Sequence, residues 1–235
     1  MRLNNYISST GICSRREADK LIEQGKVKVN GKIAVLGTKV EDTDTVEVNG
    51  KVIKKKVNDI YIALNKPIGI TCTTEKHIKG NIIDFINYPE RIFPIGRLDK
   101  DSEGLILLTN DGSIVNKILR EENNHEKEYI VTLDKDINEE FIKNMSNGVK
   151  IYNPVKKSYT ITKKCNILKI NKRTFKITLS QGLNRQIRRM TSKCGYNVVK
   201  LKRVKIMNIT IEDLPIGKWR YLSKEELEDI HEKLE

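Results

Sequence analysis

A string of acidic residues in the middle of the chain has the types and spacing that could do chemistry. It runs from Phe93 to Asn110 and places Asp99, Asp101 and Glu103 at alternating positions just before an apolar run. Residues two apart in an extended segment share a face, so Asp99 and Asp101 could converge. Converging carboxylates could act as the acid and base of a glycosidic hydrolase. A polar surface loop is the plainer alternative, but the apolar flanks indicate that one end is buried.

The same string matches the opening of a calcium-binding loop. That loop needs a bidentate Glu at its twelfth position, where Asn110 stands, and Pro94 and Gly96 are incompatible with the helix that should enter it. The four cysteines and three histidines are scattered, without the spacing of metal ligands. We therefore expect no metal site, and reduced, mostly packed thiols.

Two further sequence segments could supply cationic or aromatic partners for a catalytic carboxylate. On a helix, Arg185, Arg188 and Arg189 would lie three and four residues apart on one stripe. We expect Arg185 and Arg189 to face phosphate, while one of the three could turn inward and hold a carboxylate. A neighbouring arginine lowers the pKa of a carboxyl by about 1–3 units, which favours a nucleophile or base over a general acid. Lys127 and Tyr129 begin a strand, and the tyrosine could stack on a base.

The positive charge of the chain is concentrated in one segment. The 235 residues hold 44 Lys and Arg against 31 Asp and Glu, a net charge of +13. Residues 141–211 contain 18 Lys and Arg and no acid, which leaves 26 basic against 31 acidic residues elsewhere. A compositional bias toward lysine would not remove the acids from one segment. The one-sided charge therefore indicates a polyanionic partner, a nucleic acid.

The first 50 residues predict a helix followed by a small sheet. Ser14 and Glu17 form a capping box that opens a helix. Alternating valines and two Asn-Gly turn signals follow it. Arg15 and Arg16 occupy the first helical turn, where cations are unfavourable beside the positive end of the helix dipole. This conflict predicts contact with phosphate, although both side chains could simply be solvated.

Two domains are expected, at residues 1–53 and 59–235, joined by a Lys-rich linker at 54–58. The elements expected in the second domain are strands at 61–64, 105–109, 129–133 and 174–180, and helices at 111–120, 137–145, 184–194 and from 223 onward. No regular βαβ period connects them, so the fold class is α+β with an antiparallel or mixed sheet. Without a membrane-length apolar run or a signal peptide, we expect a cytoplasmic protein.

Taken together, these strings resemble bacterial RNA pseudouridine synthases of the RsuA/RluB/RluE/RluF family, from end to end of the chain. Gly96-Arg-Leu-Asp99 resembles the catalytic motif, with Asp99 at its essential aspartate. The string from Tyr61 to Gly69 resembles the first motif, a structural turn beside the site. Tyr129 matches the tyrosine that packs on the target base. The N-terminal module resembles the small S4 RNA-binding domain.

The resemblance also implies roles for residues around the aspartate. Arg188 matches the basic residue that pairs with it, Ile187 an apolar pocket wall, and Arg97 an arginine that meets the RNA near the extruded nucleotide. Asp101 and Glu103 become structural residues. The catalytic residues expected are Asp99, Tyr129 and Arg188, and those expected to bind RNA are Arg97, Ile187, Arg185, Arg189, Lys127, Arg15 and Arg16.

The implied reaction is an isomerisation that needs no cofactor. The N1–C1′ bond breaks, the uracil turns and C5 joins C1′, while Asp99 either attacks C1′ or removes a sugar proton. The strings 91–102 and 181–190 are most similar to the RluF branch, which implies a uridine of large-subunit (23S) rRNA and possible action on a tRNA anticodon arm. Some relatives have His where Arg185 stands, which argues against the small-subunit rRNA branch.

Three alternatives stay open at this point. One is the small-subunit branch of the same family, and another is a non-catalytic ribosome-assembly factor, which would not need Asp99, Tyr129 and Arg188 together. The third is a hydrolase that releases free uracil. We expect a monomer that binds RNA and neither a metal nor a membrane.

Overall fold

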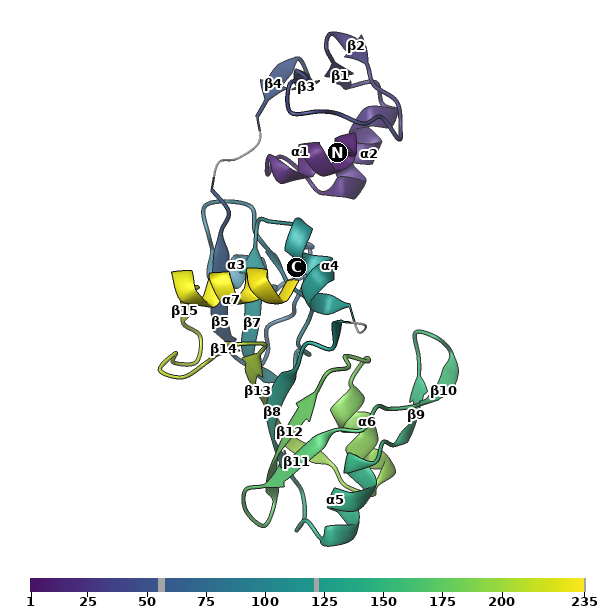
Figure 1. Ribbon diagram of the computed structural model, residues 1–235, viewed down its shortest axis with the longest axis vertical. Helices are drawn as coiled ribbons and strands as arrows, with labels where there is room; N and C mark the ends of the chain where they lie inside the picture. Colours follow the sequence, from purple (N-terminus) through teal and green to yellow (C-terminus); the bar gives the residue numbers. More distant parts are fainter. Residues whose placement is uncertain (55–57, 121–122, 235) are drawn as a thin grey trace. The chain divides into compact units, whose positions relative to one another are not determined.

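The computed structural model describes residues 1–54, 58–120 and 123–234 and divides into two compact units (Figure 1). The first contains residues 1–60 with 88–93 and 109–112, and the second contains 61–87, 94–108 and 113–235. The expected linker at 54–58 falls largely on residues 55–57, which lie outside the described residues. Within the described ranges, no helix is long and apolar enough to cross a membrane.

The N-terminal unit contains the predicted helix and small sheet, and a further helix at Leu3–Ser9 precedes them. Helices α1 (Leu3–Ser9) and α2 (Arg15–Glu23) precede a sheet of order β2-β1-β3-β4. Its strands are β1 (Val27–Val29), β2 (Lys32–Ile33), β3 (Val46–Val48) and β4 (Lys51–Ile53). The capping box is present: Ser14 Oγ accepts from the Glu17 N–H at 3.2 Å, and the Ser14 N–H donates to the Glu17 carboxylate at 2.7 Å. Asn30-Gly31 and Asn49-Gly50 all have positive φ, as tight hairpin turns require.

The second unit is organised on a nine-stranded sheet whose main path is β11-β12-β8-β13-β7-β5-β15. Its strands are β5 (Tyr61–Lys66), β6 (Phe93–Pro94), β7 (Glu103–Thr109), β8 (Lys127–Leu133), β11 (Asn166–Lys169), β12 (Thr174–Leu179), β13 (Val198–Ile206), β14 (Ile209–Thr210) and β15 (Trp219–Tyr221). The β13–β7 pair is parallel, while β13 is antiparallel to β8. The predicted mixed α+β class is confirmed.

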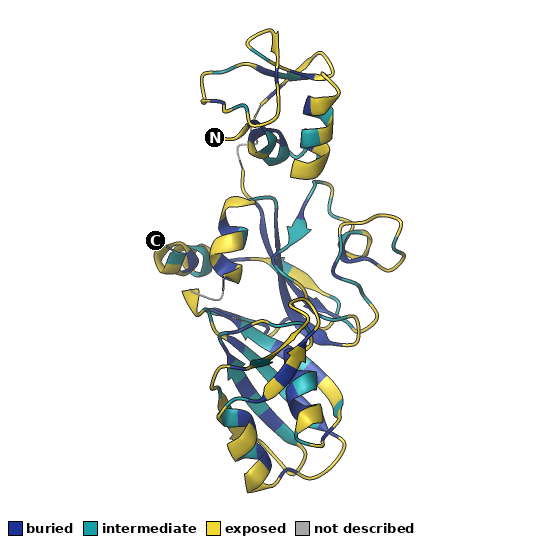
Figure 2. Ribbon diagram, turned by 90° about the vertical axis from the view of Figure 1, so that its right-hand side faces the viewer, coloured by how far each residue is buried: buried dark blue, intermediate teal, exposed yellow. Residues whose placement is uncertain are grey.

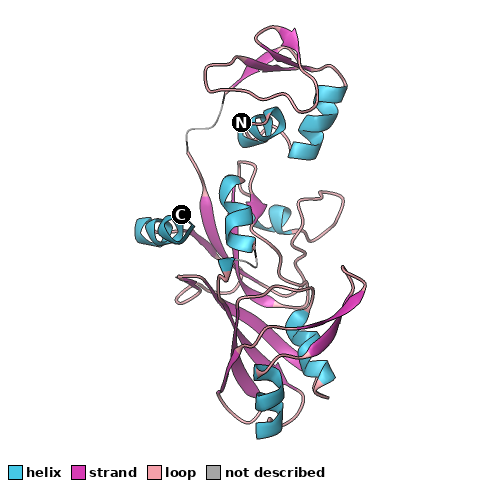
Figure 3. Ribbon diagram, turned by 45° about the vertical axis from the view of Figure 1, so that its right-hand side comes forward, coloured by secondary structure: helices cyan, strands magenta, loops and turns pink. Residues whose placement is uncertain are grey.

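Two hydrophobic cores lie along this sheet, each covered by helices (Figures 1 and 3). The first core joins β5 and β7 to α4 (Ser113–Leu119) and α7 (Lys224–Leu234). The second joins β8 and β12 to α5 (Glu139–Ser146) and α6 (Gln186–Lys193). Strand β13 contributes Leu201 to the second core and Ile206 to the first. Strands β5 and β7 are buried along their whole length (Figure 2).

Some elements differ from the sequence expectation. Strand β7 begins at Glu103 rather than at 105, because Glu103 and Gly104 pair with Lys202 and Arg203 of β13. Helix α6 begins at Gln186 rather than at 184, because Arg185 adopts the left-handed conformation at φ +49°. Helix α3 (Ile82–Ile86) and the separate hairpin of β9 (Lys150–Asn153) and β10 (Ser158–Ile161) were not expected, since neither is long enough to show a clear period.

Candidate active site

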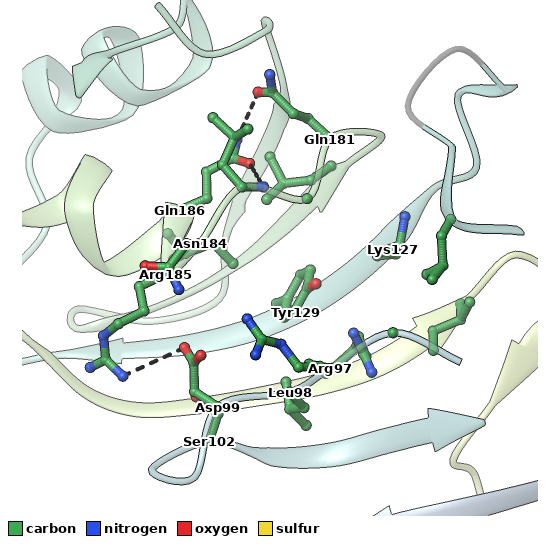
Figure 4. A pocket seen from close by; sticks show the side chains of 18 of the residues that line it. Arg97, Leu98, Asp99, Ser102, Lys127, Tyr129, Gln181, Asn184, Arg185 and Gln186 are labelled. Atoms are coloured by element: carbon green, nitrogen blue, oxygen red, sulfur yellow. Dashed lines mark hydrogen bonds and ion pairs between the residues drawn. The ribbon is translucent and has the colours of Figure 1, made fainter. Parts of the chain in front are cut away.

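A cavity of about 410 Å³ opens in the second unit, where the two cores meet (Figure 4). Residues of both cores line it, among them Ile95 and Ile206 of the first and Ile187 and Leu201 of the second. The polar and charged side chains in its wall are Arg97, Asp99, Ser102, Lys127, Tyr129, Gln181, Asn184, Arg185, Gln186, Arg188 and Arg203. A cavity that combines apolar walls with converging polar groups is typical of a small-molecule or base-binding site.

Asp99 lies in a turn held from both sides. The Ser102 N–H donates to the Asp99 carbonyl at 3.1 Å, and Ser102 is 1% exposed at the entry to β7. The Gly69 N–H donates to the Lys100 carbonyl at 2.8 Å, which ties the turn to the segment after β5. That segment is itself fixed by the buried Lys66, whose ammonium donates to two backbone carbonyls. The Asp99 side chain remains one-third exposed and lines the cavity.

Arg185, rather than Arg188, is the arginine next to Asp99. Its Nη1 lies 3.6 Å from Asp99 Oδ2, while the same guanidinium donates two hydrogen bonds to Asp101, at 3.0 and 2.7 Å. Arg188 donates to the Asp101 carbonyl at 3.0 Å and to Ser102 Oγ at 3.1 Å. The expected Arg188–Asp99 pair is therefore not formed. Arg185 is left-handed and stands just before α6. Its side chain therefore does not lie on the same helix face as Arg188, as a continuous helix would require.

Asp101 organises both arginines. Its carboxylate lies 3.5 Å from Arg188 Nε in addition to the two hydrogen bonds from Arg185. The bonded Arg185 guanidinium, helped by the charge of Arg188, holds the pKa of the Asp101 carboxyl below its ordinary value. The pKa of Arg185 is raised in return. Asp101 thus binds both arginines, and its two hydrogen bonds hold the Arg185 guanidinium beside Asp99.

Arg189 has partners within its own loop. Its Nε donates to the Asn184 carbonyl at 3.0 Å and its Nη2 to Asn184 Oδ1 at 3.2 Å. The neighbouring Gln186 side chain accepts from the Leu183 N–H at 3.0 Å and donates to Gln181 at 3.1 Å. These bonds hold the segment before α6 in place beside the cavity (Figure 4).

Tyr129 and Lys127 project into the cavity from β8, as their positions two apart on a strand require. Tyr129 is half-buried and packs against the second core. Lys127 is 9% exposed, and its ammonium donates to the His125 carbonyl at 3.1 Å. Burial, reinforced by the charge of Arg203, lowers the pKa of Lys127. Lys127 is therefore part of the cavity wall rather than of the open surface.

Arg203 is a cavity residue that the sequence reasoning missed. It is 4% exposed, and its Nε donates to the Leu105 carbonyl at 2.6 Å. Its buried Nη2 has no hydrogen-bond partner among the described residues. A signal was available: Arg203 stands two residues after the buried Leu201, on the inward-facing side of β13. Because lysines stand on both sides of it in the sequence, Arg203 resembles one more exposed basic residue.

The remaining predicted residues are found in different surroundings. Arg97 is exposed at the rim of the cavity, and Ile187 is 5% exposed in its wall. Arg15 and Arg16 belong to the first unit, exposed in the first turn of α2, and Arg15 donates to Asn5 at 3.3 Å. Among the described residues, no three His, Cys, Asp or Glu side chains form a cluster that could hold a metal ion.

Comparisons with known proteins bear on this site. The family model described as RNA pseudouridylate synthase matches residues 60–193, and that of the S4 domain matches residues 1–46. The dual-specificity RNA pseudouridine synthase RluF of Escherichia coli is 55% identical, covering 100% of this chain and 80% of that protein. The ribosomal large subunit pseudouridine synthase B of Bacillus subtilis is 36% identical, covering 96% of this chain and 93% of that protein.

A solved structure agrees. A crystal structure of a pseudouridylate synthase superimposes with a TM-score of 0.71 at 29% identity, covering 98% of this chain and 99% of that one. The resemblance predicted from the sequence, including the likeness to RluF, is confirmed. The chain belongs to the RNA pseudouridylate synthase family, the isomerases that convert uridine in RNA to pseudouridine.

Proposed function

We propose that this chain isomerises a specific uridine of large-subunit rRNA and that Asp99 is its catalytic carboxylate. The observation that carries the proposal is the position of Asp99: it is partly exposed in the cavity wall, with Arg185 at 3.6 Å and Tyr129 in the same wall. Two routes are open to the Asp99 carboxylate: attack at C1′ and removal of a sugar proton.

The reaction balances without a co-reactant. The N1–C1′ bond breaks, the detached uracil turns, C5 bonds to C1′, and the hydrogen on C5 is replaced by one on N1. The cavity must hold the uracil while it turns, and Tyr129 offers a flat face for it. Arg188 serves as a positioning residue in this scheme, because it binds the backbone and side chain of the turn that carries Asp99.

The uridine must leave its stack to reach Asp99. Extruding a base costs a few kcal/mol, least in loops and bulges. Contacts from Arg97 at the rim and Tyr129 in the wall would offset that cost. Lys127 and Arg203 are buried residues of the cavity wall whose side chains can only donate hydrogen bonds, and such donors suit the carbonyl oxygens of uracil.

The substrate class rests on the relatives and on charge. RluF is named a dual-specificity RNA pseudouridine synthase, which supports a second RNA substrate beside rRNA, and we propose a tRNA anticodon arm for it. Arg15, Arg16, Arg185 and Arg189 would contact the RNA backbone. We also propose domain limits at 1–53 and 59–235, supported by family-model matches that end at 46 and begin at 60. We also propose that the enzyme acts as a monomer in the cytoplasm.

The test is pseudouridine mapping in large-subunit rRNA and tRNA incubated with wild-type protein, Asp99→Asn and Asp99→Ala. Wild-type protein should create one new pseudouridine in a loop. Both variants should abolish it and leave RNA affinity nearly unchanged. Asp229→Asn, an exposed acid on α7, is the matched control and should retain full turnover.

Each rival function has its own outcome. RNA binding without any new pseudouridine would make the chain a binding factor, and release of free uracil would make it a hydrolase. A modification in small-subunit rRNA alone would move it to that branch of the family. Turnover that survives in Asp99→Ala would remove Asp99 from the catalytic role.

A further inference from the structure

The hairpin of β9 and β10 is a separate two-stranded sheet beside α6 (Figure 1). Tyr152 pairs with Tyr159 across it, and Lys150 pairs with Ile161. Because side chains alternate between the faces of a strand, these four residues share one face of the hairpin. The other face carries Ile151, which is buried in the second core.

The hairpin is firmly built. At its base, the Val149 N–H donates to the buried Thr162 hydroxyl at 2.9 Å. At its tip, the Asn153 carboxamide accepts from the N–H groups of Val155 and Lys156, at 3.0 and 3.2 Å. Such a side-chain-bonded turn fixes the tip without help from a partner. The outer face is therefore held in one arrangement.

That outer face is aromatic and apolar, although it faces outward. Tyr159 and Ile161 are each 68% exposed, and Tyr152 is 43% exposed. The two tyrosine rings lie 5.5 Å apart at 69°, and the Lys150 ammonium lies 5.6 Å from the Tyr159 ring centre. The outer face of a solvent-exposed hairpin is normally polar. An exposed aromatic pair beside a cation is typical of a surface on which bases stack.

Charge and position decide what this face binds. The hairpin and its flanks carry Lys150, Lys156, Lys157, Lys163 and Lys164 within the acid-free segment 141–211. At the tip, Val155 lines the same cavity as Asp99. An RNA whose uridine enters that cavity therefore passes the hairpin, and its phosphates meet lysines.

We propose that the outer face of the β9–β10 hairpin, formed by Lys150, Tyr152, Tyr159 and Ile161, binds unpaired nucleotides that flank the target uridine. One or two of their bases stack on Tyr152 and Tyr159, while the lysines of the hairpin contact the phosphates. This inference rests on the proposed function, because it takes the cavity as the uridine site. The hairpin thereby selects single-stranded loops over continuous duplex.

Binding and turnover are measured separately to test it. Fluorescence anisotropy gives the Kd for a labelled stem-loop that carries the target uridine, and single-turnover kinetics give the rate at saturating enzyme. Tyr159→Ala and Tyr152→Ala should each raise Kd about tenfold, as expected for the loss of one base stack. The saturating rate should stay at its wild-type value. Tyr159→Phe should restore affinity, because stacking needs the ring and not the hydroxyl.

Two controls isolate the hairpin face. Leu168→Ala changes an equally exposed side chain, 61% exposed on β11 in the same basic segment, and should leave Kd unchanged. A duplex of the same length without a loop should bind all variants equally. Wild-type affinity in the Tyr152→Ala, Tyr159→Ala double variant would overturn the proposal. So would an equal loss of affinity for loop and duplex.

Cross-linking supplies an independent readout. With 4-thiouridine placed in turn at each position flanking the target, cross-links should map to the peptide that contains Tyr159 or Tyr152. Cross-links confined to other segments would overturn the hairpin assignment. If wild-type protein binds the RNA but forms no pseudouridine, the proposed function fails, and the anisotropy and cross-linking results still decide the role of the hairpin.

Discussion

The two halves of the second unit differ in the chemistry they supply to one cavity. The half built on β5, β7, α4 and α7 brings the carboxylates, Asp99 and Asp101, in the turn before β7. The half built on β8, β12, α5 and α6 lies mostly in the acid-free segment and brings Arg185 and Arg188. Neither half holds a complete site. Carboxylate and cations meet only because β13 joins the two cores.

The ion pair between the two halves depends on the fold. Here Asp101 is bonded to Arg185 across 84 residues of sequence, so the contact exists only in the folded protein. The Asp101–Arg185 ion pair therefore forms only when the two halves are packed together.

The largest expected effect comes from a cavity made in either core. Leu105→Ala in the first core and Phe141→Ala in the second should each lower the free energy of unfolding by about 4 kcal/mol. For a chain of this size the Tm should fall by about 10 °C. Because β13 belongs to both cores, thermal unfolding followed by circular dichroism should show the second unit melting as a whole. If only the damaged half melted early, the halves would be independent.

The next effect concerns the junction itself. Gly104 has φ +110°, and a Cβ there would collide with the backbone of Arg203 on β13. Gly104→Ala should cost about 3 kcal/mol through overpacking and backbone strain. Gly112→Ala, where a Cβ meets only Phe93 at 4.0 Å, is the control and should change little. Equal denaturation midpoints for the two variants would contradict the importance of this close approach.

A smaller effect, on the catalytic rate, is expected when the Asp101 carboxylate that binds Arg185 and Arg188 is removed. Asp101→Asn breaks the paired hydrogen bonds to Arg185 and frees the cation beside Asp99. The single-turnover rate should fall about 10²-fold, the order expected for a catalytic group displaced by about 1 Å, with RNA affinity retained. Asp136→Asn removes a carboxylate bonded to Arg173 away from the cavity and should leave the rate unaltered. An unimpaired Asp101→Asn enzyme would show that the turn positions Asp99 without help.

The smallest effect is on pH-dependent stability. The pKa of Asp101 is depressed in the folded protein, whereas in the unfolded chain it should be about 3.9. Its stabilisation is therefore fully present above that value and is lost as the pH falls through the folded pKa. The Asp101 side chain is 48% exposed, so solvent screening limits the contribution to about 0.5 kcal/mol. The Tm of wild-type protein and of Asp101→Asn should converge as the pH falls below about 4, and a constant difference would contradict this.

Local features of the fold were predictable because their causes are local. The Ser14–Glu17 capping box and the two Asn-Gly turns each depend on a few adjacent residues, and the structure forms all of them. The hairpin of β9 and β10 was missed, because strands of four residues with exposed tyrosines do not show the expected alternation of apolar and polar positions. In this hairpin the exposed residues Tyr152, Tyr159 and Ile161 are aromatic or apolar, whereas exposed strand positions are usually polar.

By itself, the sequence determined the fold class, the family and the motifs that place Asp99, Tyr129 and the arginines around one cavity. It also determined where the positive charge gathers, since charge along a chain does not depend on folding. Only the tertiary structure decided which arginine approaches Asp99 and that Arg203 turns inward with a donor left over. The reason is that the predicted spacing assumes a continuous helix from 184, whereas Arg185 is left-handed and α6 begins only after it, at Gln186. Contacts across 84 residues are set by how two cores pack, which no short-range pattern contains.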